Sequence, residues 1–186
     1  GKEATTGFTG IWNLMSGQVV ANTTAVGTQM LTGFNSSNAS FHRWATLYKY
    51  IRQGFIFLDN AKDYMGSEQD VSYISKKDMD RLKAETKFLI AYSYFSLFEL
   101  YGPVPLITEI EDPENKTIDY PRASVDEIVN YIDRLLQEVL DSNALPETLF
   151  TESASGSLDY EHNNDRYNLK EIVRPTKVTV LALRAK

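Results

Sequence analysis

The stretch LKAETKFLIAYSYFSLFELYGPVPL, residues 82–106, decides the fold that the sequence predicts. Its middle part, residues 88–101, is apolar on almost every side of a helical period, which is typical of a helix covered by several neighbours. Gly102 and Pro103 follow directly, and proline cannot continue a helix. We therefore predict one long, buried helix over residues 77–101 that ends in a sharp turn.

Other segments predict helices that surround this one. In residues 41–65 apolar side chains recur at three- and four-residue steps, and Gly66 offers a stop. A helix is predicted to begin after Ser124, because Glu127 follows at the spacing of a capping box. Two shorter helices are predicted over residues 5–15 and from Pro175 onward.

The aromatic residues, 12% of the chain, have two possible roles: a tyrosine-rich core or a surface that stacks on ligands. Their helical spacing favours the core. The predicted core contains Trp44, Tyr48, Ile51, Phe88, Tyr92, Phe95 and Ile132. The polar residues 147–172 are predicted to form a loop, and residues 16–40 either a long loop or a disordered segment. The predicted class is all-α, with antiparallel helices and long loops.

Composition excludes several functions. The net charge of -6 and the pI of about 5.0 disfavour a nucleic-acid partner and adhesion to an anionic bilayer by charge. The chain has no cysteine, so disulfides, thiolate metal sites and thiol catalysis are excluded. No apolar run approaches the roughly 20 residues of a membrane span.

No catalytic or metal-binding pattern is present. The two histidines, His42 and His162, have no neighbouring partners that suggest a triad or a metal site. One segment alternates oxygen ligands as calcium loops do: Asp159, Glu161, Asn163 and Asp165. It lacks the glycine and the final glutamate of such a loop, which favours a solvated loop. We predict no catalytic residue, no metal and no cofactor.

Three segments carry motifs in a recognisable order. The first has Trp44, Tyr48 and Ile51, followed by Asp59-Asn60-Ala61. The second is the stretch 82–106, which resembles the pattern A-E-A-x-F-L-R-A-x-x-Y-F…Y-G-x-V-P-L. The third runs from Pro121-Arg122-Ala123-Ser124 through Leu145-Pro146 to Arg174-Pro175-Thr176-Lys177. Together they resemble the SusD/RagB family of Bacteroidetes outer-membrane lipoproteins, although Thr86, Ile90 and Val173 depart from the usual residues.

The resemblance implies a tetratricopeptide-like fold and a non-catalytic role. Residues 1–186 would form the SusD-like N-terminal helical domain of a longer protein. That protein would be a surface-exposed outer-membrane lipoprotein, held by an N-terminal lipid anchor outside this chain. It would bind oligosaccharides during polysaccharide utilisation and deliver them to a SusC-like TonB-dependent transporter. A helical-repeat adaptor that binds a peptide is the alternative, and a glycan-cleaving enzyme is a third class that no motif supports.

The predicted binding site lies in the loop before Trp44. Sugar recognition needs flat aromatic faces for the ring and polar groups for the hydroxyls. The loop offers both, in Phe34, Asn35, Asn38, Phe41 and His42. The resemblance supports this region only, because no motif aligns these residues one by one. Structural roles are the alternative, with Phe41 stapling the helix start and Phe34 anchoring the loop.

Overall fold

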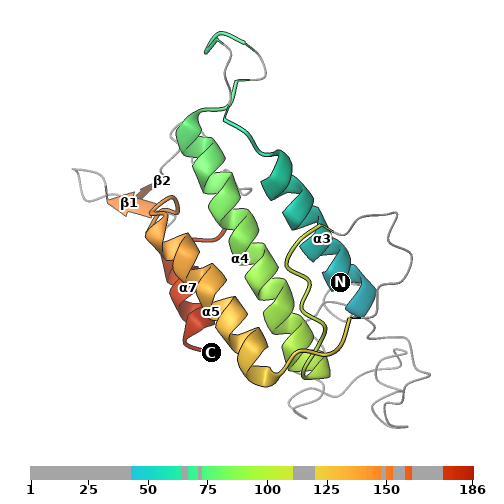
Figure 1. Cartoon of the computed structure of the whole chain (residues 1–186). Coiled ribbons are helices and arrows are strands. Elements are labelled where there is room, and N and C mark those ends of the chain that lie inside the picture. The colour runs from blue at the N-terminus through green and yellow to red at the C-terminus, as the bar shows by residue number, and fades with distance from the viewer. Residues whose placement is uncertain are drawn as a thin grey trace, which may run out of the picture. The chain divides into compact units, whose positions relative to one another are not determined.

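A computed structural model describes residues 43–63, 67–70, 73–110, 120–147, 150–152, 158–160 and 174–186 (Figure 1). The described helices are α3 (Trp44–Asn60), α4 (Lys76–Tyr101), α5 (Val125–Asp141) and α7 (Lys177–Arg184). Two short strands, β1 (Phe150–Glu152) and β2 (Leu158–Tyr160), pair antiparallel. The chain separates into two units, residues 1–43 and 44–186, and all these elements belong to the second.

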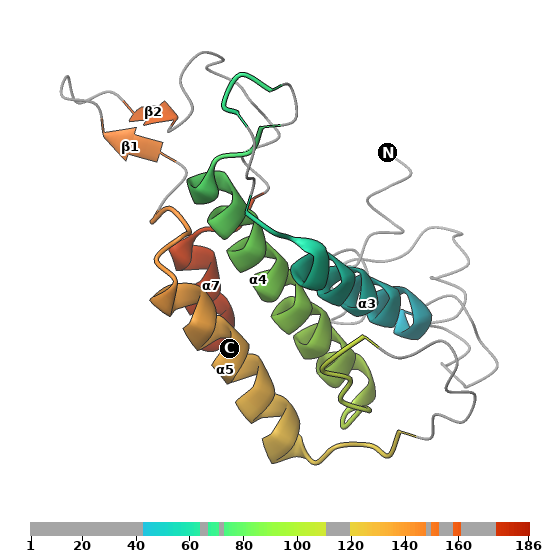
Figure 2. The ribbon, with the colours of Figure 1, turned by 45° about the horizontal axis from the view of Figure 1, so that its top comes forward.

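Helix α4 is the central element of this second unit. It lies between α3 and α5 in both views and packs against each of them, while α7 packs against α5 (Figure 2). Ser75 caps its start by accepting a hydrogen bond from the Asp78 backbone N–H at 3.1 Å. It ends at Gly102, whose φ of 67° is in the left-handed region that favours glycine. The sequence predicted this helix and its stop.

Neighbouring helices run antiparallel along the chain. The backbone N–H of Trp44, at the start of α3, donates to the Tyr101 hydroxyl at the end of α4. Lys87 in α4 pairs with Glu138 near the end of α5, and Arg184 at the end of α7 pairs with Asp133 in the middle of α5. The predicted all-α class with antiparallel helices is therefore confirmed.

Two parts of the predicted secondary structure differ from the structure. Helix α3 ends at Asn60, whereas the apolar stripe predicted a helix to residue 65. The apolar period continues beyond the helix and so predicted too late an end. At the actual end, the Asn60 side chain donates back to the Ile56 carbonyl at 2.8 Å. The prediction of a loop over residues 147–172 is wrong where β1 and β2 pair, with Thr151 opposite Asp159. Strands of three residues are too short to give a detectable alternation. The predicted helix 5–15 and the segment 16–40 lie outside the described residues.

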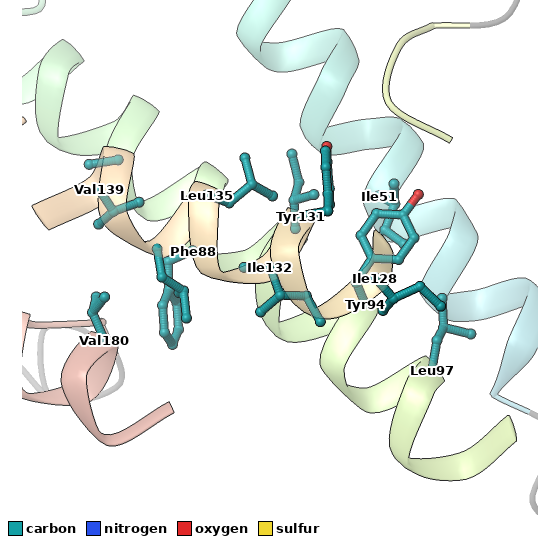
Figure 3. Close-up of a cluster of buried hydrophobic side chains, with 14 of the residues drawn as sticks. Ile51, Phe88, Tyr94, Leu97, Ile128, Tyr131, Ile132, Leu135, Val139 and Val180 are labelled. Atoms are coloured by element: carbon teal, nitrogen blue, oxygen red, sulfur yellow. The ribbon is translucent and has the colours of Figure 1, made fainter. Parts of the chain in front are cut away.

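The core joins the facing sides of the helices (Figure 3). Ile51, Phe88 and Ile132 are buried as predicted, and Trp44, Tyr48 and Phe95 pack partly buried against them. The prediction for Tyr92 is wrong, since 43% of this residue is exposed. One helical turn separates Tyr92 from Phe88, so its ring stacks beside that of Phe88, with centroids 6.2 Å apart. Tyr94, which the predicted core lacked, is fully buried.

Gly54 determines how closely α3 approaches α4. It is buried, and a Cβ atom at this position would lie 2.7 Å from Cγ1 and 2.9 Å from Cδ1 of Ile90. Ile90 is itself only 1% exposed, so it has little room to move. The two helices can therefore be this close only because residue 54 has no side chain.

Candidate ligand-binding site

The chain after α4, residues 102–110, is fixed across α3 and α4 by two tyrosine hydroxyls. The Tyr48 hydroxyl donates to the Pro105 carbonyl at 2.6 Å. The Tyr94 hydroxyl donates to the Ile107 carbonyl at 2.5 Å and accepts from the Ile107 backbone N–H at 2.9 Å. Burial raises the pKa of Tyr48 to about 12, against the opposing field of Arg122, so this phenol keeps its proton at neutral pH. The segment thus has a rigid attachment to both helices.

Arg122 closes the turn at the end of α4. Its guanidinium donates to the Pro103 carbonyl at 2.7 Å and to the Tyr101 carbonyl at 3.3 Å. The same group lies 6.0 Å from the centroid of the Trp44 ring, a cation–π contact. Motif residues from all three segments singled out in the sequence therefore meet in one place. Their role there is structural.

A second cluster joins α4 to the start of α7. One Glu85 carboxylate oxygen accepts from Nε of Arg81 at 3.0 Å and from Nε of Arg174 at 2.9 Å. The other oxygen accepts from an Arg174 terminal nitrogen at 3.1 Å, which completes a bidentate pair. Arg81 and Glu85 are both buried, and a buried charge without a partner is strongly destabilising, so each compensates the charge of the other. This cluster is also part of the scaffold.

A groove of about 280 Å³ lies beside α3 and residues 107–109. Tyr48, Ile51 and Ile107 supply apolar lining, which we call the floor of the groove; the whole lining consists of Ala45, Tyr48, Lys49, Ile51, Arg52, Ile107 and Glu109. Lys49 and Arg52 form no ion pair with any acidic residue that the structure describes, Glu109 included. The groove therefore combines an apolar floor with charged groups that are available to a ligand.

A larger groove of about 520 Å³ runs across the other ends of the helices, from the end of α3 over α4 to the end of α5. Leu58, Ala84 and Val139 are among its apolar lining residues. Its charged side chains are paired within the protein: Lys87 contacts Glu138 at 2.7 Å, and Lys83 contacts Asp63 at 3.5 Å. A ligand here would meet a largely neutralised surface.

The five residues predicted as a binding site lie outside the described part of the chain: Phe34, Asn35, Asn38, Phe41 and His42. The structure therefore leaves that prediction untested. Within the described ranges, no group of three or more His, Cys, Asp or Glu side chains is placed to hold a metal ion. The same ranges contain no helix long and apolar enough to cross a membrane.

Comparison with known proteins identifies the family. A SusD-like family described as starch-binding associating with outer membrane matches residues 12–157. The chain belongs to this SusD-like family. No curated protein sequence matches it.

Solved SusD-like structures share the fold. A SusD superfamily protein from Bacteroides thetaiotaomicron VPI-5482 aligns with a TM-score of 0.64 at 21% identity, covering 99% of this chain and 40% of its own. A laminarin-binding SusD-like protein gives 0.54 at 24% identity, covering 75% of this chain and 24% of its own. A SusD-like protein from Bacteroides fragilis NCTC 9343 gives 0.53 at 24%, covering 76% and 22%. This SusD-like chain thus spans between 22% and 40% of the length of these solved relatives.

Sequence reasoning missed the charged groove of this SusD-like chain. Lys49 and Arg52 were not singled out, because whether a cation is paired depends on the fold. One signal was available: residues 44–58 contain both cations and no acidic residue, in a chain whose net charge is -6. Glu109 comes from a distant segment that only the folded chain brings beside α3.

Proposed function

We propose that this chain is the helical part of a non-catalytic, glycan-binding protein of the outer-membrane surface. The observation that carries the proposal is the match of residues 12–157 to a SusD-like family described as starch-binding and outer-membrane associated. The family description names binding and no reaction, and the motif residues of this chain are occupied in scaffold contacts. A laminarin-binding protein among the structural relatives is consistent with a glycan ligand.

The wider assembly is part of the same proposal. A SusC-like TonB-dependent transporter would receive the oligosaccharide, and an N-terminal lipid anchor beyond this chain would hold the protein at the membrane. Residues 1–186 would be the N-terminal helical domain of a longer SusD-like protein. The support is that the solved relatives are much longer, since the chain spans at most 40% of those described above. Co-purification of the complete protein with a barrel-forming transporter would test this arrangement.

The proposed glycan site contains Phe34, Asn35, Asn38, Phe41 and His42, which supply aromatic faces and hydroxyl-binding groups. The test is calorimetry with laminarin- and starch-derived oligosaccharides on the chain and on the complete protein. Phe34→Ala and Asn38→Ala should weaken binding. Asn130→Ala, an exposed change on α5, is the matched control and should leave affinity unchanged. If both loop variants bind like the unmodified protein while remaining folded, the loop is not the site. Release of shortened glycan products would contradict the non-catalytic role.

A helical-repeat adaptor that binds a peptide is the second candidate. The observation that favours it is the 520 Å³ groove over α3, α4 and α5, whose apolar lining includes Leu58 and Val139. Ser142→Trp would place a large ring in this groove. A peptide ligand should then be lost, whereas glycan binding in the loop 34–42 should persist. Loss of glycan binding in this variant would instead assign the glycan to the larger groove.

A further inference from the structure

We propose that the groove beside α3 binds the carboxylate of an acidic sugar, a uronate unit within a glycan; this inference rests on the proposed glycan-binding function. The groove is lined by Ala45, Tyr48, Lys49, Ile51, Arg52, Ile107 and Glu109. Its volume of about 280 Å³ is just below the range typical of ligand pockets, roughly 300–1,000 Å³. It therefore suits one sugar ring of a chain and not an extended oligosaccharide.

The first step in the argument is charge. Most basic side chains of the described residues form ion pairs, among them Lys76, Arg81, Lys83, Lys87, Arg134, Arg174, Lys177, Arg184 and Lys186. In the part of the chain that the structure describes, Lys49 and Arg52 form none, although they sit one turn apart on α3 and line the same groove. Two adjacent, uncompensated cations in an acidic protein attract an anion.

The second step is the chemistry of recognition. A guanidinium binds a carboxylate through two parallel hydrogen bonds, and an ammonium adds a second charged donor. Glu109, which also lines the groove, can accept hydrogen bonds from ring hydroxyls. Lys49 and Arg52 contribute two positive charges and Glu109 one negative charge, so the lining carries a formal charge of about +1. This charge balances the single carboxylate of a uronate ligand. That balance favours a uronate over a polyanion such as a nucleic acid, which needs an extended basic surface.

The third step is rigidity. The floor of the groove is held in place before any ligand arrives, because the Tyr48 hydroxyl is bonded to Pro105 and the Ile107 backbone to Tyr94. Ile51 is buried in the core at 1% exposure. A fixed apolar floor can cover the C–H face of a sugar ring without losing conformational entropy on binding. The arrangement thus supplies an apolar face, a carboxylate clamp and a hydroxyl acceptor in one small groove.

The test compares two probes of the same shape: a trimer of galacturonic acid and its methyl ester, which has no charge. Calorimetry on the chain should show the acid binding about tenfold more tightly than the ester, the size expected for one charge-assisted contact. Arg52→Gln and Lys49→Gln should each reduce this preference. Added salt should lower the affinity for the acid but not the affinity for the ester. Lys77→Gln is the matched control, because among the described residues Lys77 forms no ion pair and it lines neither groove.

Three outcomes separate the inference from the proposed function. Equal affinity for acid and ester, or an Arg52→Gln variant that keeps the preference, overturns the uronate site while glycan binding stands. Binding of laminarin or starch oligosaccharides without any binding of either trimer also overturns the uronate site and leaves glycan binding in place. Failure of every oligosaccharide to bind, in a chain that circular dichroism shows to be folded, overturns both. Arg52 is exposed and unpaired among the described residues, so its replacement is expected to leave the fold intact.

Discussion

Helices α3 and α5 are both 17 residues long and both pack against α4, but their starts are fixed in different ways. Helix α5 carries its own capping box, in which Ser124 and Glu127 bond each other's backbone N–H groups. Helix α3 depends on a residue 57 positions later, since the Trp44 backbone N–H donates to the Tyr101 hydroxyl at 3.2 Å. One start is encoded locally, and the other exists only once α4 is in place.

The two helices also differ in how much they bury. The inward face of α5 contains six buried side chains: Ile128, Tyr131, Ile132, Leu135, Leu136 and Val139. The buried residues of helix α3 are Ile51 and Gly54 alone. The charges follow the same division: Asp133 and Glu138 of α5 are paired, while Lys49 and Arg52 of α3 form no ion pair with any residue that the structure describes. We infer that α5 completes the core, whereas α3 covers it and keeps its outer side available to a ligand.

The largest expected effect is on the α5 side of this comparison. Leu136→Ala should lower the free energy of unfolding by about 3 kcal/mol, because Leu136 is 1% exposed and its loss leaves a cavity. Urea denaturation followed by circular dichroism measures the change. Val129→Ala on the same helix is the control: this side chain is 46% exposed, so its loss should cost less than about 0.5 kcal/mol. Similar effects of the two changes would show that α5 does not complete the core.

A smaller effect is expected where α3 meets α4. Gly54→Ala should lower the free energy of unfolding by about 2 kcal/mol, because the new Cβ would lie 2.7 Å from Ile90 Cγ1. Alanine is the better helix former by about 1 kcal/mol, so a helix that did not contact Ile90 would be stabilised instead. The sign of the change therefore distinguishes close packing from helix propensity.

Ile90→Ala provides the control for this steric argument. In that background the atoms that would clash are absent, so Gly54→Ala should become neutral or stabilising. A double-mutant cycle by urea denaturation gives the coupling between the two positions. Additive effects, with no coupling, would mean that the cost of Gly54→Ala has another source.

How much the sequence could predict follows the same division between the two helices. The start of α5 was predicted to the residue, because the cap and the helix are neighbours in sequence. The bounds of α3 were less accurate, since its start depends on Tyr101 and its apolar stripe continues beyond Asn60. Tyr92 followed the helical period of the core and is nevertheless exposed, because periodicity identifies a stripe but not which neighbours cover it.

The candidate sites were less predictable than the fold. The aromatic and amide residues of the predicted loop 34–42 could be chosen by chemistry, but no pattern tied them to one another. The groove beside α3 depends on Glu109, from another segment, lining the same groove as Arg52, and on Lys49 having no ion-pair partner among the described residues. Both are consequences of tertiary structure, which helical period and capping signals do not encode.

The smallest expected effect concerns the cap that α5 has and α3 lacks. Ser124→Ala should lower the free energy of unfolding by about 1 kcal/mol, because the Glu127 backbone N–H loses its acceptor at the start of the helix. The Ser124 backbone N–H, with help from its hydroxyl, donates to the Glu127 carboxylate and holds the pKa of that carboxyl below its ordinary value.

This lowered pKa gives the cap a pH dependence of known sign. A carboxyl whose pKa is lowered by folding stabilises the folded state above its ordinary pKa, and this contribution is lost as the pH falls through the folded value. The Glu127 contribution should therefore be complete above about pH 5 and disappear in more acidic solution. Glu127→Gln can keep the hydrogen bond but cannot titrate, so it should remove this part of the acid dependence measured by urea denaturation. Asp126→Asn, one residue earlier and without a bond to the cap, should retain it. An acid dependence that is unchanged in Glu127→Gln would show that the start of α5, like that of α3, depends on contacts with α4 and not on a local cap.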